Sequence, residues 1–180
     1  DAQARIREEE SPRSLRWKDD WGQRVGSFVR NLQGGYVLQD NPESVEQPST
    51  WNVAGDVPVS DRENRALRQM WRLGRWVNSN AAVLGTTGQV FGVGAGQQSR
   101  VDAVRLAVDK YREFHAGEGD PLVLSSDGFF PFPDNVEVAA EVGVDAIVTP
   151  GGSKKDDEVL AAADDHDIGM IFTDTRAFYH

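Results

Sequence analysis

Short apolar runs of strand length alternate with segments of helical periodicity through most of this 180-residue chain. Parallel strands need helical crossovers, whereas a tight turn between two runs makes an antiparallel hairpin. The alternation therefore predicts an α/β fold, a three-layer α/β/α sandwich with a mixed sheet. Strands are expected at 36–39, 81–84, 89–93, 122–124, 146–149 and 169–172, and helices from Ser60, from Ser99, over 135–142 and from Ser153.

The helix expected after Ser60 has the clearest local signal. Ser60 and Glu63 have the spacing of a capping box, in which the serine accepts from a backbone N–H and the glutamate binds back to the cap. Apolar residues follow at helical spacing and should face the core. They are Ala66, Met70, Leu73 and Val77, with Trp71 and Trp76 beside them.

Three unusual loops should meet at one edge of the sheet. Parallel strands joined by right-handed crossovers end at the same edge, and ligands of such sheets bind there. The loops cover residues 92–100, 125–135 and 149–158. This edge is therefore the first place to look for function.

The loop at 92–100 is rich in glycine and ends in Arg100. Free amides at a helix N-terminus and a forked guanidinium suit a phosphate or carboxylate. A dinucleotide loop needs G-x-G-x-x-G, but the segment that starts at Gly94 has Ser99 in the last position, which disfavours that interpretation. A purely structural glycine turn remains an alternative.

The other two loops leave similar choices open. Residues 125–135 contain three phenylalanines and two prolines, which form either a hydrophobic plug or one wall of a pocket for a flat heterocycle. Asp134 is either a ligand contact or the N-cap of the next helix. In the third loop, Ser153 could simply cap a helix while Lys154 stays solvated.

Composition excludes several classes of function. The formal net charge of −10 argues against a nucleic-acid partner, which needs clustered cations. No apolar run is long enough to cross a bilayer, so no membrane association is expected. Cysteine is absent, which rules out disulfides and thiolate metal sites and favours a cytoplasmic location. Residues 1–30 are predicted to be a polar arm or linker, and 31–180 a single domain.

Several segments in a fixed order resemble one family. Together they are far more specific than any one of them, and they cover about residues 30–180. They are similar to the aminoimidazole carboxamide ribonucleotide (AICAR) formyltransferase domain, which in many organisms follows an inosine monophosphate (IMP) cyclohydrolase domain. The segments are Gly34–Asp40, Ser79–Ala81, Gly92–Arg100, Ser126–Phe132, Pro150–Ser153 and Thr173–His180.

The resemblance implies a cytidine deaminase-like fold without zinc, present as two related subdomains, of which this chain is similar to the second, C-terminal one. It implies transfer of a formyl group from N10-formyltetrahydrofolate to the 5-amino group of AICAR, a step of purine (IMP) biosynthesis. The family works as a dimer, so a homo-oligomer is expected.

The resemblance also implies roles for particular residues. Asn80 would contact AICAR near the reacting amine, Arg100 and Arg176 its polar or phosphate groups, and Phe129 its ring. Asp127 would help to hold a structural potassium ion. The positions that match folate contacts are Val101, Asp134, Ser153 and Lys154.

The chain departs from the family pattern in three places. The family's catalytic Lys-His pair lies in the first subdomain, and no Lys-His dipeptide occurs here. Pro133 stands where an arginine is usual, and Gly128 where an alanine is usual. The base is therefore expected from an N-terminal half in cis or trans, the chain being a fragment or half of a split enzyme. The alternative is a non-catalytic nucleotide- or folate-binding regulatory module.

Overall fold

The computed structural model describes residues 27–40 and 51–178. The chain divides into two units, Asp1–Asn41 and Pro42–His180. The first 26 residues of the predicted polar arm lie outside the described residues. Strand β1 spans Ser27–Leu32, so the division expected after residue 30 falls inside a strand.

The first unit contains an antiparallel hairpin. Strand β1 pairs with β2, Gly35–Asp40, through a turn in which Gly34 has a φ of +87°. The sequence predicted the second strand, and residues 27–30, which it assigned to the arm, belong to β1. Val29 lies opposite Leu38 on one face of this hairpin, and both side chains are exposed.

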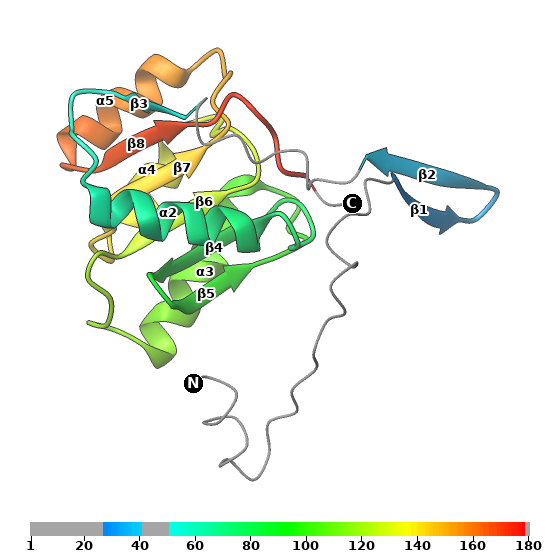
Figure 1. Cartoon of the computed structure of the whole chain (residues 1–180), viewed down its shortest axis with the longest axis horizontal. Coiled ribbons are helices and arrows are strands. Elements are labelled where there is room, and N and C mark those ends of the chain that lie inside the picture. The colour runs from blue at the N-terminus through cyan, green and yellow to red at the C-terminus, as the bar shows by residue number, and fades with distance from the viewer. Residues whose placement is uncertain (1–26, 41–50, 179–180) are drawn as a thin grey trace, which may run out of the picture. The chain divides into compact units, whose positions relative to one another are not determined.

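The second unit is built on a mixed sheet of six strands in the order β3-β8-β7-β6-β4-β5 (Figure 1). Strands β6, β7 and β8 are parallel, and the other pairings are antiparallel. The predicted α/β fold with a mixed sheet is therefore confirmed. The strands are β3 (Asn52–Ala54), β4 (Ala82–Thr86), β5 (Gln89–Gly94), β6 (Val123–Ser126), β7 (Ala146–Thr149) and β8 (Gly169–Phe172).

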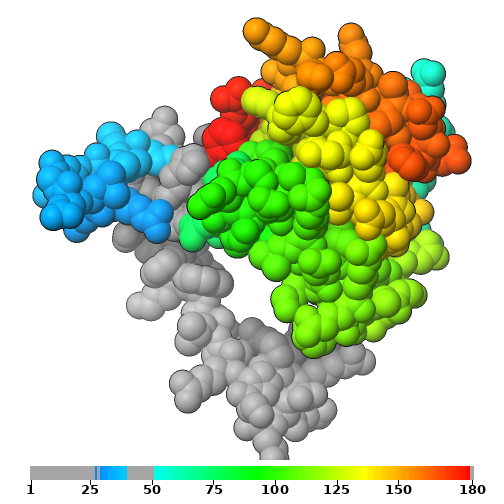
Figure 2. Space-filling view, turned by 180° about the vertical axis from the view of Figure 1, so that it is seen from behind, coloured from blue at the N-terminus to red at the C-terminus, as the bar shows by residue number. Residues whose placement is uncertain are grey.

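The helices pack against the sheet through two separate apolar clusters. One cluster joins α2 to β4, β6, β7 and β8, and the other joins α3, α4 and α5 to the sheet. The space-filling view from behind shows α3, α4 and α5 side by side in green, yellow and orange (Figure 2). The helices are α2 (Asp61–Gly74), α3 (Arg100–Phe114), α4 (Asp134–Ala140) and α5 (Asp156–Asp165).

Helix α2 begins as predicted, and Ala66, Met70 and Trp71 face the core as expected. Trp76, which was expected beside them, is 46% exposed. Ser60 and Glu63 form both bonds of the capping box. Leu67 and Trp71 are buried beside Met70, whereas Leu73 is 42% exposed. Successive helical residues are about 100° apart. A face centred on Met70, Trp71 and the close-packed Gly74 therefore points Leu73 away from the sheet.

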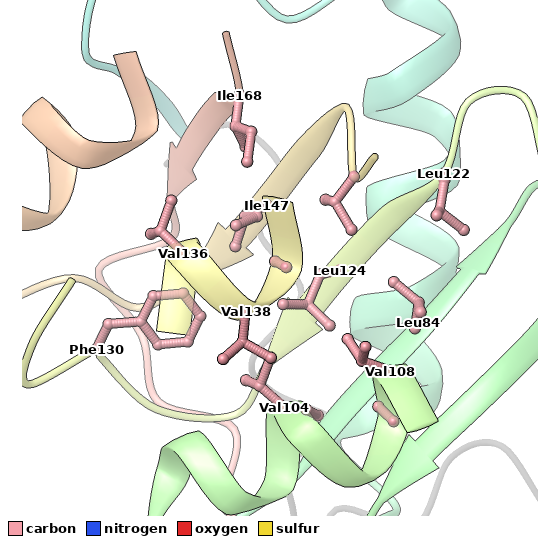
Figure 3. Packing of buried hydrophobic residues seen from close by; sticks show 14 of the residues in the cluster. Leu84, Val104, Val108, Leu122, Leu124, Phe130, Val136, Val138, Ile147 and Ile168 are labelled. Carbon is pink, nitrogen blue, oxygen red and sulfur yellow. The ribbon is translucent and has the colours of Figure 1, made fainter. Parts of the chain in front are cut away.

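The cluster around α3 and α4 includes a residue from the phenylalanine-rich loop. Phe130 is 1% exposed and lies among Val104, Val136 and Val138 (Figure 3). Phe132, two residues later, is 52% exposed. Of the two interpretations of this loop, the hydrophobic plug therefore holds for Phe130, while Phe129 is half-buried and Phe132 is exposed.

Two glycines of β5 allow α3 to pack unusually close to the sheet. A Cβ on Gly92 or Gly94 would overlap the backbone carbonyl groups of Ala107 and Ala103. Part of the glycine-rich segment thus has a packing role. None of the helices in the described ranges 27–40 and 51–178 is long and apolar enough to span a membrane.

Candidate functional site

Segments far apart in the sequence meet at the edge where β6, β7 and β8 end. Asn80 precedes β4, and Arg100 opens α3 just after β5. Ala82 is paired with both Ser126 and Gly94, so these segments lie beside the end of β6. Asp127 follows β6, and Arg176 follows β8. The predicted convergence at one sheet edge is therefore observed.

Arg100 is held by three neighbours. Its Nη1 donates to Ser126 Oγ at 3.1 Å and to Asp127 Oδ1, and its Nη2 donates to Asn80 Oδ1 at 2.8 Å. The side chains of this ion pair are 9% exposed for Arg100 and 0% for Asp127. A charge pair so well removed from water is stabilised by its mutual hydrogen bonds, and losing one partner strands the other.

Asp127 ties the segments together. Its Oδ1 accepts from the Ala81 N–H at 3.0 Å as well as from Arg100. Its backbone N–H donates to Ala81 O at 3.3 Å, and its carbonyl accepts from Ala177 N–H at 3.0 Å. This residue therefore links the approach to β4, the start of α3 and the segment after β8.

The second carboxylate oxygen of Asp127 differs from the first in its hydrogen bonding. Its Oδ2 is buried and accepts no hydrogen bond from any described residue, and the same is true of Ser125 Oγ. Buried polar atoms without partners are uncommon in native proteins and indicate an absent water, ion or neighbouring group.

The Asn80 amide is oriented by its surroundings. Its Nδ2 donates to the carbonyl oxygens of Gln97 at 3.0 Å and Gln98 at 3.3 Å, while its Oδ1 faces Arg100. Because a guanidinium can only donate, this arrangement fixes which amide atom is oxygen. The peptide bond from Ser79 to Asn80 is cis.

Phe178 connects the two arginines. The guanidinium carbons of Arg100 and Arg176 lie 5.9 Å and 5.7 Å from the centre of its ring. Arg176, which is exposed, also lies 5.5 Å from the ring centre of the half-buried Phe129. The structure thus brings Arg100, Phe129 and Arg176 together. Sequence reasoning missed Phe178, whose only signal was its place two residues after Arg176.

The other predicted contact residues form a more open region. Lys154 is exposed, and Ser153 is half-buried. Ser153 N–H donates to Asp156 Oδ1 at 3.1 Å, and its Oγ accepts from Lys155 N–H at 3.1 Å. Helix α5 begins at Asp156, so the expectation that it starts at Ser153 is wrong. The reason is that the side chain of Asp156 closes a turn ahead of the helix.

Asp134 and Val101 are the other two predicted contact residues. Asp134 is the first residue of α4 and not its N-cap, a position that Pro133 occupies. Its Oδ1 accepts from Asn135 Nδ2 at 2.8 Å. Val101, in the first turn of α3, is partly buried and packs against the core. Lys155, rather than Lys154, lies over an aromatic ring, 5.1 Å from the centre of Phe132.

The arrangement suits a flat, anionic ligand. Two guanidinium groups supply donors matched to phosphate or carboxylate, and two phenylalanine rings supply apolar faces. The Arg100 site is preformed because its polar groups are already paired, whereas Arg176 is exposed and available.

Comparisons with known proteins point to one family. The family model described as "AICARFT/IMPCHase bienzyme" matches residues 1–110, including the stretch before residue 30 where the sequence resemblance was weak. The bifunctional purine biosynthesis protein PurH of Rhodopirellula baltica is 46% identical over 151 residues, which are 84% of this chain and 28% of that protein. PurH of Acidithiobacillus ferrooxidans is 43% identical over 157 residues, 87% of this chain and 30% of that protein.

Among solved structures, a dCMP deaminase from the cyanophage S-TIM5 in its apo form matches with a TM-score of 0.38 and 16% identity, covering 58% of this chain and 94% of that one. The chain spans less than a third of the length of the two PurH proteins named above. The extent of the sequence match to PurH and the family model together show that the chain belongs to the AICARFT/IMPCHase bienzyme family.

Proposed function

We propose that this chain is the C-terminal half of an AICAR formyltransferase domain. It would bind AICAR and N10-formyltetrahydrofolate, and it would act in purine (IMP) biosynthesis together with an N-terminal half that carries the Lys-His pair. The observation that carries the proposal is the joining of Asn80, Arg100, Phe129 and Arg176 at one sheet edge. Membership of the bienzyme family supports it.

The two arginines would bind the polar and phosphate groups of AICAR. Arg100 keeps donors on Nη2 and Nε beyond the bonds that it makes to Asn80, Ser126 and Asp127. Arg176 is exposed beside Phe129, so an imidazole ring lying on Phe129 would have a cation next to it. The site thus offers both a charged and an aromatic contact to one small ligand.

The reaction forms a bond between the 5-amino nitrogen of AICAR and the formyl carbon. The bond from that carbon to N10 of the folate then breaks, N10 gains a proton and the amine loses one. The amine is a poor nucleophile because its lone pair is delocalised, so positioning and proton removal matter most. In this chain Asn80 would position the amine, and the base would come from the N-terminal half.

The folate would lie against the more open region. Asp134 offers a carboxylate that can accept from the amino and ring N–H donors of a pterin. Its only bond to a described residue is from Asn135, so acceptor capacity remains. Ser153 and Lys154 would contact the same molecule, and Val101 would add an apolar contact.

A potassium ion fits one feature of the site. Hard cations take oxygen ligands, and Asp127 Oδ2 is a buried carboxylate oxygen that accepts no hydrogen bond from the described residues. Asp127 would hold the ion, which would supply positive charge beside this buried carboxylate. The three-layer, cytidine deaminase-like classification of the fold belongs to the same proposal. It is supported by the packing of α2 in one apolar cluster and of α3–α5 in the other.

The alternative is a regulatory module that binds nucleotide or folate without catalysis. The lack of a Lys-His dipeptide in this sequence favours it. The paired state of Asn80, Arg100 and Asp127 favours the enzyme, since a module without catalysis needs no oriented amide beside its arginine.

One experiment separates these functions. This chain is mixed with the polypeptide that carries the Lys-His pair, with AICAR and N10-formyltetrahydrofolate, and release of tetrahydrofolate is followed. The proposal predicts transfer that Arg100→Ala lowers by ten-fold or more, at about 1–3 kcal/mol per lost charged bond. The matched control is Arg105→Ala, an exposed arginine on the same helix. AICAR binding without transfer would favour the module.

A further inference from the structure

The segment after β8 is folded back by a turn that Thr173 closes with its side chain. Thr173 is 1% exposed. Its hydroxyl donates to the carbonyl oxygen of Thr175 at 2.9 Å and accepts from the Thr175 N–H at 3.3 Å. Threonine hydroxyls that bond to the backbone two residues on can take the place of a backbone turn. The hydroxyl of Thr173 therefore uses its donor and one of its lone pairs on the backbone of a single residue.

The residue inside this turn has a backbone conformation that needs support. Asp174 has a φ of +55°, in the left-handed region that residues other than glycine rarely adopt. Such conformations persist where the surrounding contacts determine them. The Asp174 N–H donates to Pro150 O at 3.1 Å, and Asn52 Nδ2 donates to Asp174 Oδ2 at 3.3 Å. The Thr173 hydroxyl adds the two bonds that span Asp174.

The turn determines where Arg176 and Phe178 lie. Directly after it, the Ala177 N–H donates to the carbonyl of Asp127 at 3.0 Å. The guanidinium carbon of Arg176 lies 5.5 Å from the ring centre of Phe129 and 5.7 Å from that of Phe178. Because Arg176 is exposed, its backbone and these two rings set the direction of its side chain. A change in the turn would therefore move Arg176 relative to the ring on which the ligand would lie.

We infer that Thr173 is a positioning residue for the AICAR site, whose hydroxyl holds the turn that presents Arg176 and Phe178 to the ligand. This role rests on the proposed function for its ligand. Thr173 is buried and its hydroxyl is bonded to Thr175, so it acts through Arg176 and Phe178 rather than by touching AICAR.

Three substitutions isolate the hydroxyl. Thr173→Val removes it but keeps a branched side chain of similar shape, so the buried position stays filled. Thr173→Ser keeps the hydroxyl and should preserve the turn. Thr175→Val is the matched control, because it makes the same chemical change at a half-buried threonine whose backbone, not its side chain, forms these bonds.

A double-mutant cycle tests whether Thr173 acts through Arg176. AICAR binding is measured by calorimetry for the unmodified chain, Thr173→Val, Arg176→Ala and the double variant. We expect Thr173→Val to weaken binding about ten-fold in the unmodified chain and less than about three-fold in the Arg176→Ala background. Thr173→Ser and Thr175→Val should bind within about two-fold of the unmodified chain.

NMR of the Arg176 side chain gives a readout without ligand. Because this side chain lies beside the rings of Phe129 and Phe178, ring currents shift its proton signals. In Thr173→Val these signals should move toward those of a solvated arginine, and in Thr173→Ser they should stay. If Thr173→Val does not fold, it is compared with Asp174→Gly in the Asp174→Gly background, since glycine adopts a left-handed φ without steric cost.

The outcomes separate the two claims. AICAR binding by Thr173→Val that matches the unmodified chain would overturn the positioning role and leave the proposed function standing. An equal loss with and without Arg176 would also overturn it. If the unmodified chain binds no AICAR, the proposed function fails, and the NMR signals decide whether Thr173 positions Arg176. Signals that stay unchanged in Thr173→Val would then refute that role, and shifted signals would support it.

Discussion

Two regions at the same sheet edge are built in opposite ways. Around Arg100, buried and half-buried side chains bond to one another across three segments. Around Ser153 and Lys154, the side chains are more open, and the bonds run within a single turn. The first region is therefore fixed before any ligand arrives, whereas the second can adapt to one. Substitutions should cost stability and binding in the first region, and binding alone in the second.

Removing the Asp127 carboxylate should give the largest effect. Asp127→Ala strands the guanidinium of Arg100 and releases the Ala81 N–H, so we expect a loss of about 3–5 kcal/mol of unfolding free energy. Urea denaturation measures this loss. Asp120→Asn is the control, because that carboxylate pairs with Arg62 at the surface and should cost less than about 1 kcal/mol. Equal losses of unfolding free energy in the two variants would contradict the proposed difference between buried and exposed carboxylates.

Asn80→Ala should mainly lower the rate of formyl transfer. It removes the acceptor for Arg100 Nη2 and the donors to two backbone carbonyls. The reconstituted transfer rate should fall about ten- to hundred-fold, from the loss of about 1.5–3 kcal/mol of charge-assisted bonding. A transfer rate within two-fold of the unmodified protein would remove Asn80 from the site.

Asp134→Asn should separate the two ligands. The amide cannot accept from a pterin as a carboxylate does, so binding of N10-formyltetrahydrofolate should weaken about ten-fold. AICAR binding and the unfolding midpoint should not change. Glu137→Gln, an exposed acid on the same helix, is the matched control. A parallel loss of AICAR binding would show that the two regions are not independent.

Phe132→Ala should have the smallest effect on stability. Its ring is 52% exposed and contacts Lys155 as an exposed cation–π pair. We expect a change of less than about 1 kcal/mol in urea denaturation. Phe130→Ala, which empties a buried position in the same loop, should cost about 3–5 kcal/mol. Similar losses at both positions would contradict the division of this loop into plug and surface.

Much of the fold could be predicted from local sequence patterns. The capping box at Ser60, the hairpin around Gly88 and the helix after Ser99 are each encoded within a few neighbouring residues. Strand β3 was not foreseen, since three residues give no periodicity and its partner β8 lies far along the chain. Strand β1 was missed because polar Arg30 and Asn31 interrupt its apolar pattern.

The site was predictable only in part, because its contacts join residues that lie far apart in the sequence. The order of strands and loops predicted that the loops holding Arg100 and Asp127 would share one edge, whereas Arg176 was assigned to the site by the family resemblance. The bonds of Arg100 to Asn80 and Asp127 depend on tertiary packing that no local pattern encodes. The ligand roles of these residues stay predictions.

The most direct test is an AICAR titration of this chain with Arg100→Ala and Arg176→Ala, with Arg105→Ala as control. We expect each site arginine to weaken binding by about 1–3 kcal/mol, and the control to bind as the unmodified chain does. Unchanged affinity in both site variants would contradict the claim that these arginines bind one shared ligand.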